Sequence, residues 1–394
     1  MPLALFALTI AAYAIGTTEF VVVGLLPTVA HDLDVTLPMA GLIVSVYALG
    51  VTFGAPVLTA LTGNMNRKSL MLGLMALFIV GNLAAALSPT YELLLAARVV
   101  SAFAHGVFFS IGSTIAADLV PEDRRASAIA MMFMGLTVAI VTGVPLGTFI
   151  GQLFGWRATF WAVSLLGVLA FVAVAALLPS GLRRGEASSL MDQVRVLGSG
   201  RLLIVYGMTA LGYGGTFVAF TYLSAILQDI TGFTETSVSL LLILYGVVIA
   251  IGNIVGGKFA DKNPVRALSI LFALQAIVLV LFGFAVVSPV ATIIGLAALG
   301  FLQFANVPGL QIYVVKLAKI HRPGGIDVAS ALNIAAFNLG IALGAWVGGH
   351  VVSSSLGLAA TPMIGAALVV IALALTMLSG ALDRQTAPLA NPAE

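Results

Sequence analysis

Three ionisable residues, Glu19, Arg98 and His105, lie inside long apolar stretches, where charged side chains are rare. An ionised carboxylate is costly in hydrocarbon, so a membrane acid tends to be protonated, paired or facing water, which suits it to carry protons. His105 follows Arg98 by seven residues, which returns it to the same helical face about 10 Å deeper. Because imidazole changes its charge near neutral pH, His105 is a candidate relay toward the cytoplasm. These residues predict proton transfer inside a membrane.

Glu19 and Arg98 are expected at similar depth. If the first apolar stretch enters the hydrocarbon near Leu5, Glu19 lies about 21 Å further along and about 9 Å from the opposite face. Counted from Glu92, Arg98 lies about 9 Å inside that same face. We therefore expect a Glu19–Arg98 pair that is exchanged against a proton or a substrate. The alternatives are a static interhelical pair for Glu19, a capping contact to backbone carbonyls for Arg98 and a neutral, hydrogen-bonded imidazole for His105.

The overall composition indicates that the bilayer is the solvent of this chain. Of its 394 residues 61% are apolar, and only 17 are basic and 15 acidic, far below the usual charged fraction. This excludes a soluble enzyme, a disordered chain and a nucleic-acid-binding surface. The chain has no cysteine, and no cluster of His, Asp and Glu has metal-ligand spacing. We therefore expect neither a metal nor a cofactor.

The elements that must position these residues are twelve membrane-spanning helices in an all-α fold. The expected spans are about 4–28, 38–62, 69–88, 92–117, 126–150, 156–178, 201–226, 236–257, 266–287, 290–316, 327–352 and 360–380. They form six-helix bundles at residues 1–179 and 201–380, joined by a cytoplasmic loop at 180–200 and followed by a cytoplasmic tail at 381–394. If the N-terminus is in the cytoplasm, 15 of the 17 basic residues lie on the inner, cytoplasmic loops. The positive-inside rule therefore places both termini in the cytoplasm.

The two bundles carry signs of an internal repeat. Three glycines of the fifth span, Gly143, Gly147 and Gly151, recur 197 residues later as Gly340, Gly344 and Gly348. The loops after the second and eighth spans align at an offset of 198 residues, Gly63 with Asp261. Two parallel six-helix halves are typical of a secondary transporter, in which one half rocks against the other around a site at the midplane.

These features resemble the major facilitator superfamily over the whole chain. The loop signature of that family, G-x-L-A-D-[RK]-x-G-[RK]-[RK], is matched after the eighth span by Gly257, Ala260, Asp261, Lys262 and Arg266. After the second span it is reduced to Arg67 and Lys68, with Gly63 and Asn64 where Asp and Arg are expected. Arg98 to Gly106 is similar to the R-x-x-x-G-x-x-x-G region of the fourth span. Gly135 to Gly147, with Gly143 and Pro145, is similar to the motif of drug:proton antiporters, and the whole pattern to the arabinose-efflux and chloramphenicol-exporter branch.

The resemblance implies a proton antiporter of the bacterial inner membrane that exports a sugar or an amphipathic drug such as a phenicol by alternating access, as a monomer. A proton-independent facilitator of the same fold and a non-transporting membrane sensor are the alternatives, and an enzyme is not expected. In the family fold the cavity-lining spans carry candidate substrate contacts, each of which has an interhelical hydrogen bond or packing as its alternative role. They are Tyr13, Tyr206, Tyr213, Phe217, Tyr222, Gln303, Asn306, Gln311, Asn333 and Asn338.

One segment imitates a nucleotide-binding motif. Gly252 to Lys258 nearly spells the phosphate loop G-x-x-x-x-G-K-[ST], but Phe259 replaces the hydroxyl that binds Mg²⁺, and the segment ends a membrane helix instead of following a strand. ATP is therefore not an expected partner. The driving force is expected to be an ion gradient or the gradient of the substrate itself.

Overall fold

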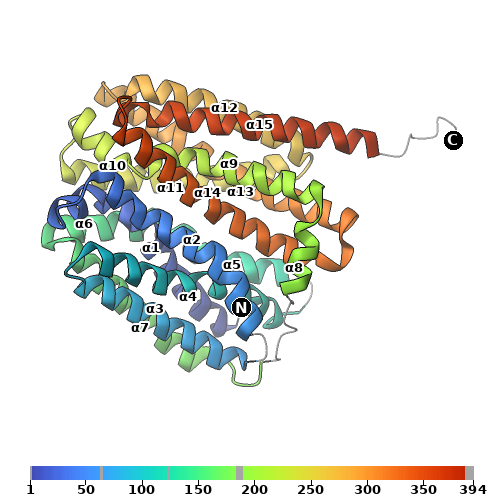
Figure 1. Ribbon diagram of the computed structural model, residues 1–394. Coiled ribbons are helices and arrows are strands. Elements are labelled where there is room, and N and C mark those ends of the chain that lie inside the picture. Colours follow the sequence, from blue (N-terminus) through green and yellow to red (C-terminus); the bar gives the residue numbers. More distant parts are fainter. Residues whose placement is uncertain (1, 63–64, 122–123, 183–189, 387–394) are drawn as a thin grey trace.

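The computed structural model describes residues 2–62, 65–121, 124–182 and 190–386, whose regular structure is helical throughout. Among these residues, twelve helical segments are long and apolar enough to cross a membrane, which confirms the all-α prediction with twelve spans. The first half comprises α1 (Leu3–Asp32), α2 (Leu37–Thr62), α3 (Arg67–Leu87), α4 (Tyr91–Asp118), a fifth span made of α5 (Arg125–Val138), η2 (Ala139–Gly143) and α6 (Val144–Phe154), and α7 (Trp156–Leu177) (Figure 1).

The second half repeats this order of spans. It comprises a seventh span made of α9 (Gly200–Phe220), α10 (Leu223–Ala225) and η3 (Ile226–Ile230), then α11 (Glu235–Ala260), α12 (Pro264–Ala285), α13 (Pro289–His321), η4 (Pro323–Gly325), α14 (Ile326–Ser353), η5 (Leu358–Ala360) and α15 (Thr361–Thr386). The helices depart from the expected bounds in several places; α13, for example, ends at His321 instead of residue 316. The central segment contains a short helix, α8 (Leu190–Leu197), and α15 continues six residues beyond position 380, because polar residues can extend a helix beyond the apolar stretch that marks a span.

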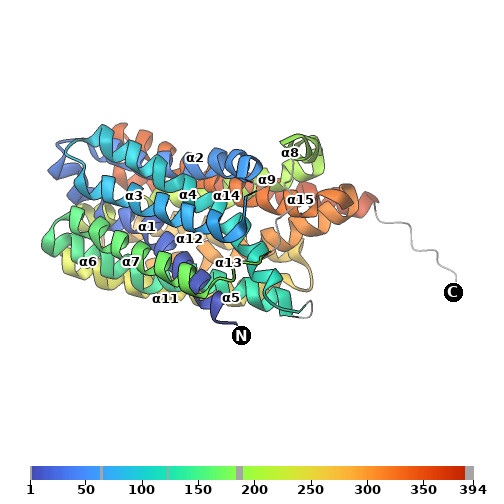
Figure 2. The ribbon, with the colours of Figure 1, turned by 90° about the horizontal axis from the view of Figure 1, so that it is seen from below.

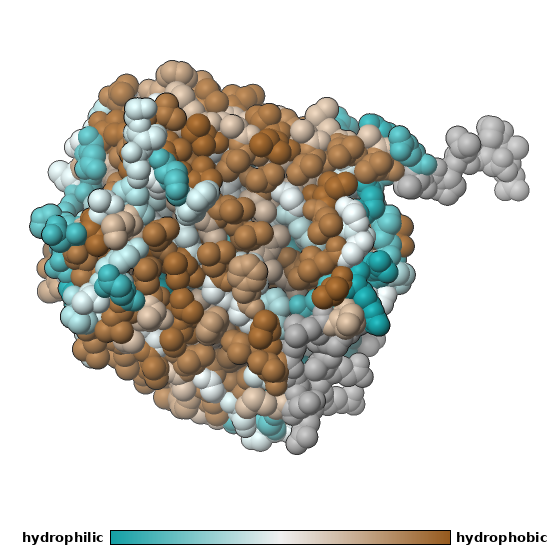
Figure 3. Space-filling model, viewed as in Figure 1, coloured by the Kyte–Doolittle hydropathy of each residue, from teal (hydrophilic) through white to brown (hydrophobic). Residues whose placement is uncertain are grey.

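The surface has the pattern of a protein embedded in a bilayer. Helices α1 to α7 form the lower part of Figure 1 and α9 to α15 the upper part, and most run side by side along one direction, as Figure 2 shows from below. An apolar band covers most of the face in Figure 3, with hydrophilic residues gathered at its two ends. Large side chains such as Leu165 on α7 and Leu281 on α12 are about 60% exposed (62% and 59%). Lipid tails, which are as apolar as leucine, would cover them.

Glycines let α1 and α9 each pack closely against a neighbouring span. A Cβ on Gly135 would lie 2.1 Å from the carbonyl oxygen of Thr9, so only glycine fits there. Two further glycine contacts of the fifth span have equivalents in the second half, at an offset of 197 residues. They are Gly143 with Thr17 and Gly151 with Leu25, and then Gly340 with Gly214 and Gly348 with Tyr222. The same small-residue packing therefore joins equivalent helices in the two halves.

Proline explains the irregular turn in the fifth span. Pro145 has no N–H, so it cannot donate the helical hydrogen bond to the carbonyl of Val141. The preceding turn, η2, is a π-helix in which Val144 N–H bonds to the carbonyl of Ala139 five residues back. A regular α-helix, α6, begins directly after it. The span thus has a discontinuity next to Pro145.

Hydrogen bonds join the two halves toward the end of the bundle opposite the termini. Ser224 Oγ donates to the carbonyl of Val23 at 2.8 Å, Ser45 Oγ to that of Ala342 at 3.1 Å and Ser239 Oγ to Gln152 Oε1 at 2.7 Å. Helix α1 is buried from Ala14 to Leu26, whereas Phe6 (47%) and Ile10 (40%) near its N-terminus and His31 and Asp32 at its other end are exposed. The halves are therefore hydrogen-bonded to each other toward this end of the bundle.

Candidate functional site

Arg98 is a completely buried cation in the first half. It lies on α4 with an exposure of 0%, and Nη1 donates to Thr18 Oγ1 at 3.0 Å. Its guanidinium carbon lies 3.9 Å from the ring centroid of Tyr47 on α2, a cation–π contact. Within the described part of the chain, Nε and Nη2 have no hydrogen-bond partner. Two unpaired donor atoms on a buried cation leave hydrogen-bonding capacity for an anion.

Thr18 links Arg98 to a chain of neutral groups. Thr18 Oγ1 donates in turn to Asn82 Oδ1 at 2.6 Å, and Asn82 Nδ2 donates to the carbonyl of Phe78 at 2.8 Å on α3. This chain fixes the orientation of the threonine hydroxyl, one lone pair of which accepts from Arg98. Three helices thus hold the guanidinium in place through uncharged partners.

Glu19 faces His105 instead of the arginine. Glu19 Oε2 lies 4.0 Å from His105 Nδ1, and both side chains are almost completely buried, at 8% and 5% exposure. Glu19 and Arg98 do not form the expected ion pair in this conformation, although each lies within electrostatic range of the other. The predicted depths of Glu19 and Arg98 in the membrane were close to correct, because Arg98 contacts Thr18, the residue next to Glu19. Neighbouring positions on a helix point about 100° apart, so the carboxyl group points toward a different neighbour.

Tyr47 was not identified from the sequence, although it contacts both Arg98 and His105. Its hydroxyl lies 3.0 Å from His105 Nδ1, while its ring covers the guanidinium of Arg98. Tyrosine is a common packing residue in membrane helices, so neither its type nor its spacing gave a signal. The site therefore contains four residues from three helices, namely Glu19 on α1, Tyr47 on α2, and Arg98 and His105 on α4. Only the carboxyl group and the imidazole can exchange a proton near neutral pH.

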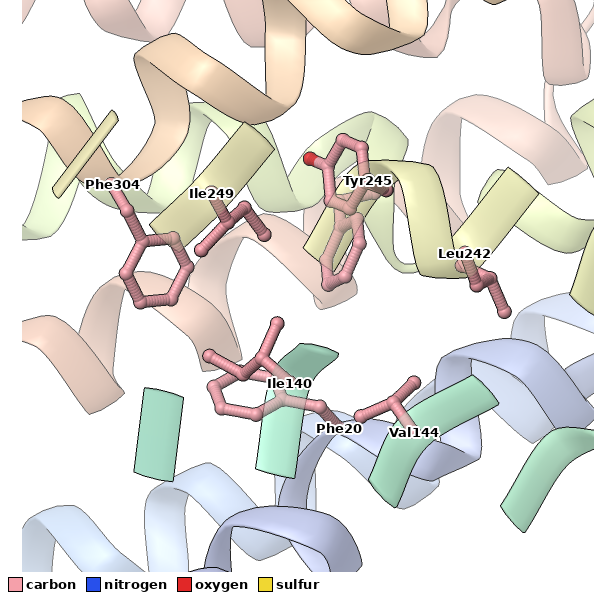
Figure 4. A pocket seen from close by; sticks show the side chains of 8 residues that line it. Phe20, Ile140, Val144, Leu242, Tyr245, Ile249 and Phe304 are labelled. Carbon is pink, nitrogen blue, oxygen red and sulfur yellow. The ribbon is translucent and has the colours of Figure 1, made fainter. Parts of the chain in front are cut away.

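Aromatic rings from both halves meet beside Glu19. Phe20 lies 6.4 Å from Phe217 and 6.5 Å from Phe304, and Tyr213 lies 5.1 and 5.5 Å from the same two rings, between centroids. A void of about 10 Å³ is lined by Phe20, Phe304 and further apolar side chains of both halves (Figure 4). Tyr213 also lies within electrostatic range of Glu19. These rings place an apolar wall next to the acid.

Most of the expected polar contacts for a substrate are instead used between helices of the second half. Tyr206 and Tyr222 donate to the carbonyls of Ala329 and Ala345. The other bonds run from Asn306 to Gln275, from Gln275 to Gly212 and Thr216, from Thr209 to Asn333, from Asn333 to Gln311 and from Gln311 to Ser330. Gln275 is a buried member of this network that sequence reasoning missed. These hydrogen bonds correspond to the alternative role of the polar candidates, that of holding helices together.

A few candidates keep unused polar atoms. Gln303 accepts from Tyr245, but its Nε2 is buried without a partner among the described residues, as are Asn306 Oδ1 and Asn338 Oδ1. Tyr13, which is only half-buried, lies 3.3 Å from Thr142 Oγ1 through its hydroxyl. With the rings of Tyr213 and Phe217, these atoms are the remaining candidates for contact with a substrate.

The loop-signature residues lie at the end of the bundle that carries α8. Arg67 is buried at the start of α3 within electrostatic range of Asp118, while Asn66 caps the helix by accepting from Lys68 N and Ser69 N. Gly63 and Asn64 lie outside the described residues. In the second half, Gly257 lies near the end of α11, which stops directly before Asp261 and Lys262. Two residues after Asp261, Asn263 Oδ1 accepts from the backbone N–H of Arg266. No hydrogen bond or ion pair joins the described residues of either loop to Glu19.

The segment that imitates a phosphate loop is helical. Gly252 and Gly256 lie within α11, where an added Cβ would come within 2.0 and 1.9 Å of the carbonyls of Phe301 and Ala305 on α13. These glycines therefore allow α11 and α13 to pack closely, and they do not form a loop around a phosphate.

A polar cluster fastens the far end of the first half. Arg157 Nη1 lies 2.5 Å from Asp32 Oδ2, Trp156 Nε1 donates to the same oxygen at 2.9 Å, and Arg157 also donates to the carbonyl of Ser88. Hydrogen bonds from both residues hold the pKa of Asp32, at the end of α1, below its usual value. A cavity of about 680 Å³ lies beside this cluster and reaches Glu235 of the second half. The cluster ties α1, α3 and α7 together.

Comparison with known proteins agrees with this architecture. The family model described as Major Facilitator Superfamily matches residues 8–324 and, in a second match, 202–394. The uncharacterized MFS-type transporter YtbD of Bacillus subtilis (strain 168) is 55% identical over 97% of this chain and 96% of the relative. The inner membrane transport protein YdhP of Escherichia coli (strain K12) is 40% identical over 98% of each. A chloramphenicol resistance protein of Streptomyces lividans is 34% identical over 87% of this chain and 88% of the relative.

A solved structure shows the same fold at low sequence identity. It is a bacterial homologue of the human lysosomal transporter Spinster, in an inward-facing and unoccupied conformation. It covers 97% of each chain with a TM-score of 0.76 at 16% identity. The likeness confirms the arrangement of the twelve spans expected from the sequence.

Proposed function

Because this chain belongs to the Major Facilitator Superfamily, we propose that it exports a small molecule by proton antiport with alternating access. Membership makes it a multi-pass membrane transporter and not an enzyme. We further propose a location in the bacterial inner membrane with both termini in the cytoplasm, which the basic inner loops and the location of YdhP support. The units that move are the bundles of residues 1–179 and 201–380, and the transporter works as a monomer.

The observation that carries proton coupling is the isolated carboxyl group of Glu19. In the described residues it accepts no hydrogen bond, and the nearest group that can take its proton is His105 Nδ1 at 4.0 Å. A lone carboxyl group is more stable protonated in such surroundings, whereas an ionised one needs a cation. Arg98, with two unused donors, is that cation after a movement of the side chain. Binding and release of a proton at Glu19 thus change the charge beside the interface between the halves.

Alternating access follows from the position of this site. Phe20, the neighbour of Glu19, contacts rings of the second half, so a change at Glu19 acts where the halves touch. When the far-end hydrogen bonds break and the other end closes, Glu19 and the substrate would become open to the opposite side. Binding of either a proton or a substrate, but not both, would give antiport.

The wall beside Glu19 favours an uncharged, ring-containing amphipathic molecule such as a phenicol as substrate. Its rings offer broad apolar contact, while most nearby amides already bond to one another and leave few atoms for a polyhydroxylated sugar. The likeness to a chloramphenicol resistance protein supports this choice. A panel of chloramphenicol, arabinose and a lipophilic cation in a pump-deficient strain tests it. We expect protection against chloramphenicol only, whereas export of arabinose alone would contradict the choice.

Glu19→Gln tests the coupling in proteoliposomes. We expect this variant to lose chloramphenicol transport driven by a pH gradient while keeping chloramphenicol exchange, because glutamine preserves the shape but cannot release a proton. Glu92→Gln is the matched control, since Glu92 is exposed in the first turn of α4. Unchanged gradient-driven transport by Glu19→Gln would favour the proton-independent facilitator. No flux of any solute in the native protein would favour the non-transporting sensor.

A further inference from the structure

We propose that Tyr47 is a positioning residue of the coupling site, whose hydroxyl occupies His105 Nδ1 and thereby keeps the proton on Glu19 in this conformation. The inference rests on the proposed function of Glu19 and adds a residue to it. Tyr47 is 2% exposed, and its hydroxyl lies 3.0 Å from His105 Nδ1, closer than Glu19 Oε2 at 4.0 Å. The hydroxyl and the carboxyl group therefore compete for one nitrogen.

The competition follows from the chemistry of imidazole. A neutral imidazole has one nitrogen that accepts and one that donates. When the Tyr47 hydroxyl donates to Nδ1, the lone pair of that nitrogen is used and cannot take the proton of Glu19. For transfer, the hydroxyl must rotate away with its own hydrogen. The O–H bond of Glu19 then breaks as an N–H bond forms at Nδ1, which leaves a carboxylate beside an imidazolium.

Arg98 holds Tyr47 where this competition can occur. The cation–π contact at 3.9 Å sets the ring of Tyr47 against the guanidinium, which Thr18 in turn fixes through Nη1. Val51 and Ala102 pack against the same ring. The hydroxyl is thus directed at His105 by groups that do not titrate near neutral pH.

The surroundings of His105 contain few other charges. From α1 it is faced by Glu19, from α2 by Tyr47, and on its own helix Arg98 lies two turns away. The described ionisable residues of α3 and α5 are confined to their first turns, at Arg67, Lys68 and Arg125. From the second half, Tyr213 lies in electrostatic range of Glu19. Tyr47 is therefore the group best placed to control transfer between Glu19 and His105.

Infrared titration of the purified protein in lipid tests the inference without a substrate. The carboxylic-acid band that disappears in Glu19→Gln reports the proton on Glu19. In Tyr47→Phe the ring remains on Arg98, but Nδ1 of His105 no longer accepts a hydrogen bond. The band should therefore be lost at a pH about one unit lower than in the native protein, which is the effect of one hydrogen bond of ordinary strength. In a His105→Gln background, Tyr47→Phe should cause no shift, because its effect acts through the imidazole.

Tyr222→Phe is the matched control, since it also loses a buried hydroxyl bond, to the carbonyl of Ala345 at 3.0 Å in the second half. It should leave the titration midpoint unchanged. An unchanged midpoint in Tyr47→Phe, or a shift that persists in the His105→Gln background, would overturn the inference. If the midpoints shift as expected but the native protein moves no protons with a substrate, the inference stands and the proposed antiport is wrong.

Discussion

At the scale of single residues, the site depends on which neighbour each buried polar atom can reach. Thr18 and Glu19 follow each other on α1, yet the first accepts from Arg98 and the second faces His105. The arginine is thus held by neutral groups and an aromatic ring, with spare donors for a carboxylate. A charge that is buried but incompletely paired is typical of functional positions in membrane proteins.

Arg98→Lys should destabilise the protein although it preserves the charge. An ammonium group is more strongly hydrated than a guanidinium, and it cannot lay a flat face on Tyr47, a contact worth about 2 kcal/mol when desolvated. We expect the melting temperature of the detergent-solubilised protein to fall by a few degrees. Arg266→Lys, at an exposed position, is the control and should melt like the native protein. Equal melting of both variants would refute the stabilising role of the stacked guanidinium.

The sequence revealed those residues of the site whose type is unusual in a membrane. Glu19, Arg98 and His105 stand out because a charge is costly in hydrocarbon. Tyr47 and Gln275 do not stand out, because tyrosines and amides are ordinary interhelical residues. Counting residues along a span gives depth to within about a turn, but the rotation of a helix about its axis depends on packing that one sequence does not reveal.

At the scale of elements, the first half depends on close approach between α1 and the fifth span. Gly135 contacts the backbone of Thr9, and Pro145 converts the middle of the span into the π-helical turn η2. Small residues at every fourth position favour such close packing, and proline breaks the hydrogen-bond ladder of a helix, but the sequence did not show that α1 is the partner or that the turn is π-helical. The short helix α8 was missed, since its polar sequence resembles that of a loop.

Gly135→Ala should be destabilising because its new methyl group would meet a carbonyl oxygen at 2.1 Å. The cost of such overpacking is about 1–3 kcal/mol, and it should appear as a lower melting temperature. Gly73→Ala, on α3 with nothing within 4 Å of its Cβ, is the matched control and should be neutral or slightly stabilising. A lower melting temperature for Gly73→Ala than for Gly135→Ala would be inconsistent with this packing.

Pro145→Ala should make the fifth span more regular and slow the exchange between conformations. With an N–H restored at this position, η2 can convert to α-helix, which removes the discontinuity. We expect a protein at least as stable as the native one with a reduced rate of chloramphenicol exchange. A faster exchange rate would argue against a role for this turn in movement.

At the scale of the whole molecule, hydrogen bonds join the halves toward the end opposite the termini. Ser224 and Val23 form one of the joining contacts, at 2.8 Å. The native chain has no cysteine, so introduced thiols can be studied without background. These contacts between the halves are a property of the packed chain that hydropathy does not reveal.

A disulfide between Val23→Cys and Ser224→Cys should lock the far end closed. We expect oxidation of this double variant to stop transport and reduction to restore it, because alternating access requires the contact to open. Either single variant under the same oxidant is the control and should keep its activity. Continued transport by the fully cross-linked protein would contradict opening at this end.

The most direct test of proton antiport measures protons moved by the native protein. Proteoliposomes containing the pH dye pyranine, with the membrane potential clamped by potassium and valinomycin, are given an outward gradient of chloramphenicol and no pH gradient. We predict that the interior acidifies as chloramphenicol leaves, and that Glu19→Gln abolishes this change. Chloramphenicol efflux through the native protein with no change in internal pH would contradict the central claim.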